Sequence, residues 1–83
     1  SHTTVDFEAE VTDDSAMAAL RACKEKYQGV ARKGVVAIEL KLQGYESVEI
    51  ANLYGTTVNN VNAWISRARS KLRNEPALME ILC

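Results

Sequence analysis

Residues 58–73 combine hydrogen-bonding and positively charged side chains in an arrangement that suits contact with double-stranded DNA. Asn59, Asn60 and Asn62 lie near the start of this segment. An asparagine amide donates and accepts hydrogen bonds at once, which matches the edge that adenine presents in the major groove. Arg67 suits a guanine edge or a phosphate. The basic residues after it suit phosphates, and phosphate contacts position a protein on DNA without specifying sequence. The candidate DNA-binding residues of this segment are Asn59, Asn60, Asn62, Ala63, Ser66, Arg67, Arg69, Ser70, Lys71 and Arg73.

The same segment has the apolar spacing of an amphipathic helix that starts after Thr57, a good N-cap residue, and runs to about Arg73. Its apolar positions recur at intervals of three and four and form one stripe, made by Val58, Val61, Ile65, Ala68 and Leu72. At 100° per residue, the opposite side holds Asn59, Ala63, Ser66, Arg67 and Ser70. Asn74, Glu75 and Pro76 then end the helix, and the proline suits the first turn of a short helix over 77–82.

A shorter helix over about residues 47–54 is predicted to brace this one. Ser47 or Glu46 suits its N-cap. The side expected to be buried consists of Ile50, Ala51, Leu53 and Tyr54. Ala51 is small enough for a second helix to approach closely, and Gly55 follows where the chain needs a positive φ angle.

The two helices joined at Gly55 predict a helix-turn-helix over residues 46–73, in which the first helix braces the second and the second lies in the major groove. Ser47 and Thr57 stand at the two helix starts, where hydroxyl and amide hydrogens suit backbone phosphates. These two residues complete the set of candidate DNA-binding residues. An ordinary solvated helix face is the alternative interpretation of the asparagines and of the basic run.

Two helices are expected before this unit. The first starts near Thr12 or Asp13 and is ended by Gly29, and the second covers about residues 31–42. The second has an apolar residue at most of its positions from Val35 to Leu42, which is typical of a central core helix. Residues 1–11 lack a helical period and are interpreted as a flexible acidic arm, whereas residues 12–83 form the domain. The sequence therefore predicts an all-α fold, a small helical bundle of four to five helices that contains a helix-turn-helix.

Charge is distributed unevenly along the chain. The net charge is −1, but residues 1–14 hold five acidic residues and no basic one, and residues 15–83 carry +4. A basic body of this kind suits nucleic acid. Cys23 and Cys83 lack metal-ligand spacing and His2 is the only histidine, so no metal, cofactor or catalytic site is predicted and the chain is not expected to be an enzyme. No apolar run approaches a membrane-spanning length, and a cytoplasmic location without membrane contact is expected.

A longer pattern resembles region 4 of bacterial RNA polymerase sigma factors, particularly the extracytoplasmic-function type. The match covers about residues 35–73, and its most specific part is the Arg-Ala-Arg-x-x-Leu-Arg motif at 67–73. The residues that fit are Gly44, Tyr45, Glu49, Ile50, Ala51, Gly55, Thr57, Val61, Ile65, Arg67, Ala68, Arg69, Leu72 and Arg73. The resemblance implies a role in transcription initiation, with recognition of the promoter −35 element. It also implies contact with the β-subunit flap of the RNA polymerase core and an anti-sigma factor as a further partner.

The chain departs from that family at two places. Residues 29–34 stand where the family usually has Leu-Pro and charged residues before the second helix. Asn62 and Trp64 stand where family members often carry Lys or Arg. The Val61-x-x-Trp64 spacing is instead similar to helix-turn-helix domains of phage terminase small subunits and repressors. Those proteins, a LuxR-type regulator and a protein-interaction module are the alternatives for function. Trp64 is interpreted as packing against the 47–54 helix, or as contacting a partner or the DNA backbone.

Overall fold

Four α-helices span most of the part of the chain that the structure, a computed structural model, describes, which is residues 14–76 and residue 78. They are α2 (Asp14–Lys26), α3 (Gly29–Leu42), α4 (Ser47–Tyr54) and α5 (Val58–Leu72), and no described residue lies in a strand. The predicted all-α class is thus confirmed. The arm expected over 1–11 lies outside the described residues, and of the short helix expected over 77–82 only Leu78 is described.

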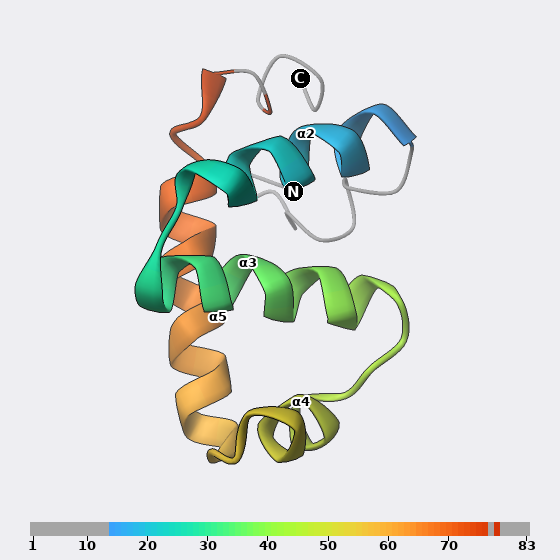
Figure 1. Cartoon of the computed structure of the whole chain (residues 1–83), viewed down its shortest axis with the longest axis vertical. Coiled ribbons are helices and arrows are strands. Elements are labelled where there is room, and N and C mark those ends of the chain that lie inside the picture. Colours follow the sequence, from blue (N-terminus) through green and yellow to red (C-terminus); the bar gives the residue numbers. More distant parts are fainter. Residues whose placement is uncertain (1–13, 77, 79–83) are drawn as a thin grey trace, which may run out of the picture.

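Helix α5 reaches along the whole bundle. In Figure 1, α2 and α3 run across the view one above the other, and α5 runs down past both of them to α4 at the far end. The apolar stripe predicted for α5 is confirmed at four of its five positions, which are the buried residues Val61, Ile65, Ala68 and Leu72. Val58 is the exception, with 37% of its surface exposed, because it stands at the first helical position, beyond the end of the core.

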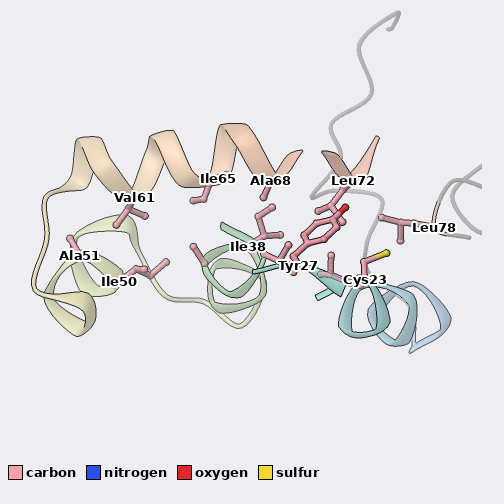
Figure 2. Packing of buried hydrophobic residues seen from close by; sticks show 13 residues of the cluster. Cys23, Tyr27, Ile38, Ile50, Ala51, Val61, Ile65, Ala68, Leu72 and Leu78 are labelled. Carbon is pink, nitrogen blue, oxygen red and sulfur yellow. The ribbon is translucent and has the colours of Figure 1, made fainter. Parts of the chain in front are cut away.

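The core is a row of apolar side chains between α5 and the other three helices. Figure 2 shows this row running from Ala51 and Ile50, near the start of α5, to Cys23 and Leu78 near its end. Its buried members are Leu20, Cys23, Tyr27, Val35, Ala37, Ile38, Ile50, Ala51, Val61, Ile65, Ala68, Leu72 and Leu78. Burying a side chain of the size of Ile38 contributes about 1.5–3 kcal/mol. The row therefore stabilises the other three helices against α5 at once.

Two residues of α4 that were expected in the core are outside it. Ile50 and Ala51 are buried as predicted, but Leu53 is 64% exposed and Tyr54 is 37% exposed. With 100° between successive residues, Leu53 lies at the edge of the face that Ile50 and Ala51 bury, beside Ile50 but nearly opposite Ala51. The burial predicted for Leu53 and for Tyr54, the last residue of the helix, is thus wrong, because a helix of two turns has only a narrow buried face.

Helices α3 and α5 approach each other closely at Gly34. This glycine lies inside α3 and is buried. A Cβ atom added there would collide with the Trp64 carbonyl oxygen and would lie 2.7 Å from the Cβ of Ala68. Real Cβ atoms do not approach other heavy atoms so closely. The backbone of α3 therefore rests directly on α5, and the small side chain of Ala68 on the facing helix makes this possible.

The backbone on both sides of α4 has the geometry that the sequence predicts. Gly55 ends α4 in a left-handed conformation with a φ of 63°. Thr57 is the N-cap of α5, and its Oγ1 accepts a hydrogen bond of 3.1 Å from the Asn60 N–H. At the other end of α4, the Glu46 N–H donates to Oε1 of Glu49 at 2.8 Å, and Glu46 is the N-cap. These contacts satisfy N–H groups that a helix start leaves without an intrahelical partner.

The connection between the first two described helices differs from the prediction. The sequence places the end of the first helix at Gly29, but α2 ends at Lys26 and Gly29 opens α3 with a φ of 61°. The Tyr27 N–H still donates to the Lys24 carbonyl at 3.1 Å, and the Tyr27 side chain is buried in the core. Burial of Tyr27 and the left-handed glycine together redirect the chain.

A carboxylate joins the end of α2 to the segment that follows α5. Glu75 accepts hydrogen bonds from Lys26 Nζ at 2.7 Å and from the Tyr27 hydroxyl at 3.0 Å. Lys71 Nζ lies over the Tyr27 ring, 5.5 Å from the ring centroid. The Lys26 hydrogen bond is the main reason why the pKa of Glu75 lies below its usual value, and the Tyr27 hydroxyl adds to this effect.

The depressed pKa of Glu75 predicts an acid-dependent loss of stability. The ionised carboxylate stabilises the fold at any pH above the pKa that Glu75 has in the unfolded chain, about 4.3. That contribution is lost as the pH falls through the lower pKa of the folded state. A Glu75→Gln variant should therefore have a lower Tm than wild type at pH 7, and the difference should shrink towards pH 3.

Circular dichroism melts at several pH values measure this difference. Glu25→Gln is the matched control, because Glu25 is an exposed carboxylate on α2, next to Lys26 in sequence, with only a 3.9 Å contact to Arg32. Its Tm difference from wild type should be small throughout. A Glu75→Gln deficit that is the same at pH 7 and pH 3 would contradict the proposed ionic contribution.

Candidate nucleic-acid interface

The solvent face of α5 carries a strip of small uncharged side chains. Asn59, Ala63, Ser66 and Ser70 are all exposed, and at 100° per residue they lie opposite the buried stripe. We call these four residues the neutral strip. The side chains that the sequence assigns to the outer face are thus exposed as predicted. Because they are small, this face protrudes little from the helix backbone, and it carries hydrogen-bonding groups along its length.

Basic side chains border the neutral strip on both sides. One border, the Lys33 flank, consists of Arg67 and Lys71 of α5 together with Lys33 of α3, whose Nζ lies 5.1 Å from the centroid of the Trp64 ring. The other border, the Lys41 flank, consists of Arg69 and Arg73 with Lys41 of α3. The sequence positions of Lys33 and Lys41 do not place them on this surface. The crossing of α3 over α5 determines where the two lysines lie.

Ser47 connects the Lys41 flank to α4 and α5. Its hydroxyl oxygen accepts a hydrogen bond from Lys41 Nζ at 3.4 Å, and the hydroxyl donates to Oδ1 of Asn62 at 3.3 Å. The three residues come from three different helices, and the Ser47 hydroxyl links the other two through one hydrogen bond to each at the start of α4. The structure thus brings the predicted residues Ser47 and Asn62 together and adds Lys41, which sequence reasoning missed.

The three asparagines have different environments. Asn60 is held by the turn before α5, because its N–H donates to Thr57 Oγ1 and its Nδ2 donates to Thr56 Oγ1 at 2.8 Å. Asn62 accepts from the Ser47 hydroxyl. Among the described residues, Asn59 has no side-chain hydrogen bond. Of the three asparagines, only Asn59 has every donor and acceptor of its side-chain amide available to a ligand.

Trp64 packs at a junction of three helices. Its ring meets the Tyr54 ring of α4 edge to face, with centroids 5.3 Å apart and an interplanar angle of 79°. The Lys33 ammonium of α3 lies over its ring. The interpretation that Trp64 packs against the helix over 47–54 is confirmed. An edge-to-face aromatic pair contributes about 0.5–1.5 kcal/mol beyond its buried area, and this pair fixes α4 against α5.

Charge along α5 itself is positive, whereas the acidic residues nearest to it in the helix-turn region, Glu46 and Glu49, lie at the start of α4. Helix α5 contains no acidic residue. Glu39 and Glu75 are paired with Lys24 and Lys26 between α2, α3 and the segment after α5. Ten basic and six acidic residues in the described part of the chain give it a net charge of +4. An anionic partner would therefore be attracted to the outer face of α5.

Among the described side chains, no group of three or more His, Cys, Asp or Glu residues is arranged to hold a metal ion. No described helix is both long and apolar enough to cross a membrane. Comparison of the chain with protein-family models, with curated proteins and with solved structures gave no match.

Proposed function

We propose that this chain binds double-stranded DNA by placing α5 in the major groove, in a helix-turn-helix formed by α4, the turn at residues 55–57 and α5. The observation that carries the proposal is the neutral strip on α5 with a basic flank on each side. A major groove about 12 Å wide has base edges on its floor and a phosphate backbone along each wall. Small hydrogen-bonding side chains suit the floor, and basic side chains on both sides suit the two walls.

The connection between α4 and α5 supports the helix-turn-helix. Three residues join the helices, and Gly55 provides the left-handed conformation that a short turn requires. Ala51 is buried beside Val61, so α4 can approach α5 closely (Figure 2). In this arrangement the first helix crosses the DNA backbone and the N-terminal part of the second reads base edges. Ser47 and Lys41 are then placed for a phosphate contact at the start of α4.

Within DNA-binding proteins, we propose the role of sigma factor region 4, which is recognition of a promoter −35 element. The support is the resemblance over residues 35–73, in particular the motif at 67–73. Contact with the RNA polymerase β flap, an anti-sigma partner and a cytoplasmic location rest on that resemblance alone. Asn62 and Trp64, which stand where relatives often carry bases, contact Ser47 and Tyr54 here. Non-specific affinity for DNA should accordingly be modest.

Selection from a random pool of double-stranded DNA tests the proposal, followed by measurement of the affinity for the enriched sequence across a salt series. A short motif without two-fold symmetry, bound by a monomer with a steep salt dependence, is the expected result. A palindromic motif would indicate a dimeric repressor with two half-sites about one helical turn apart. No enrichment and a flat salt dependence would overturn the DNA-binding proposal and favour a protein-interaction module.

A further inference from the structure

We propose that Asn59 and Ala63 are the residues that determine sequence preference, and that they read two A·T base pairs about two steps apart. Asn60 and Asn62, by contrast, hold the turn and α4 in place. This inference rests on the proposed DNA-binding function and specifies which part of the α5 face reads bases.

The first step is the availability of the asparagine amides. To recognise adenine, an asparagine must donate from its amide nitrogen and accept at its amide oxygen at the same time. Asn60 already uses its amide nitrogen on Thr56 Oγ1, and Asn62 already uses its amide oxygen on the Ser47 hydroxyl. Each bond uses one of the two N–H groups of Asn60 or one of the two oxygen lone pairs of Asn62 and also holds that amide in one orientation, so turning either amide towards a base would break the bond. Asn59 is exposed and loses no internal hydrogen bond on binding adenine.

The second step is the position of Ala63. It lies one turn after Asn59 on the neutral strip, and its exposed methyl group is an apolar surface on a polar face. The base-pair feature that matches an exposed methyl group in the major groove is the C5-methyl of thymine. Ser66 and Ser70, farther along the strip, carry hydroxyls that accept either kind of base edge and so discriminate weakly.

The third step is spacing. Four residues of α-helix rise about 6 Å, and successive base pairs are about 3.4 Å apart along a DNA strand. Asn59 and Ala63 therefore contact base pairs about two steps apart when α5 runs along the groove. The enriched motif is expected to contain an adenine and, about two positions away, a thymine.

The test is to repeat the DNA selection with Asn59→Ala, Asn60→Ala and Asn62→Ala. Asn59→Ala should lose the preference for adenine at one position and weaken binding of the wild-type motif about 5- to 150-fold. Its affinity for unrelated DNA and its Tm should match those of wild type. Asn60→Ala and Asn62→Ala should lower the Tm by a few degrees and leave the enriched motif unchanged.

The outcomes distinguish a failure of this inference from a failure of the proposed DNA-binding function. If wild type enriches a motif and Asn59→Ala enriches the same one, this inference is overturned while DNA binding stands. The same conclusion follows if Asn60→Ala or Asn62→Ala, and not Asn59→Ala, changes the preferred base. If wild type binds no DNA, both the inference and the proposed function fail. A variant Ala63→Gly should relax the thymine preference only, which tests the second residue independently.

Discussion

A Gly34→Ala variant should be less stable than wild type by about 1–3 kcal/mol, which corresponds to a Tm lower by roughly 5–20 °C. Alanine is the better helix former by about 1 kcal/mol, so helix propensity alone predicts the opposite sign. The reason for the expected loss is the contact with α5, because the new Cβ would overlap the Trp64 carbonyl oxygen and crowd the Cβ of Ala68. The two helices would have to separate along a core that has little free volume.

A double variant distinguishes this clash from other effects of the substitution. Ala68→Gly removes the side chain 2.7 Å from the new Cβ but leaves the Trp64 carbonyl in place. Gly34→Ala should therefore cost less in the Ala68→Gly background than in wild type, with the loss reduced and not abolished. Thermal and urea unfolding of the four proteins measures this coupling. A Gly34→Ala variant as stable as wild type would contradict the close approach of α3 to α5.

An Arg67→Ala/Arg73→Ala variant replaces one basic residue on each flank, and it should bind DNA about tenfold or more weakly near physiological salt. The slope of log affinity against log salt should fall by about 2, since each lost phosphate contact removes about one unit. Both side chains are exposed, so the Tm should change little. Fluorescence anisotropy with a labelled duplex across a salt series gives both quantities.

Arg21→Glu is the matched control for this double variant. It changes the net charge by the same amount, and Arg21 is exposed on α2, away from the neutral strip. A small effect of Arg21→Glu together with a large effect of the double variant would locate binding on α5. Equal losses in the two proteins would show that only total charge matters, and α5 would then not be the reading helix.

Local chemistry made most of the secondary structure predictable. The start of α5 follows from Thr57 as N-cap, and the end of α4 follows from the positive φ that Gly55 adopts. The buried stripe of α5 follows from spacing by three and four. These features depend on residues that are neighbours in sequence, which is why they can be predicted without knowledge of how the helices pack.

Features that depend on packing could not be predicted in the same way. The sequence draws attention to Ala51 as the small residue at a helix crossing, but it contains no sign that Gly34 lies against α5. The exposure of Leu53 depends on how α4 is rotated against its neighbours. Lys33 and Lys41 join the α5 face only because α3 crosses α5 nearby. Each of these results from contacts between helices that are distant in sequence.

The candidate site shows the same division. Residue type and helical spacing placed the neutral strip correctly on the outside of α5. They gave no means of ranking Asn59, Asn60 and Asn62, because all three have the same chemistry and lie within four residues. The ranking comes from the partners Thr56 and Ser47, which use parts of two of the amides.

The position of Trp64 gives the protein a built-in optical probe. It is the only tryptophan in the chain, so its emission has a single source. The indole touches Tyr54 of α4 and Lys33 of α3 while remaining partly open to solvent beside the Lys33 flank. Unfolding separates it from both neighbours, and a ligand lying along α5 changes the solvent around it. Fluorescence of the unlabelled protein can therefore follow unfolding and occupation of the α5 surface in one sample.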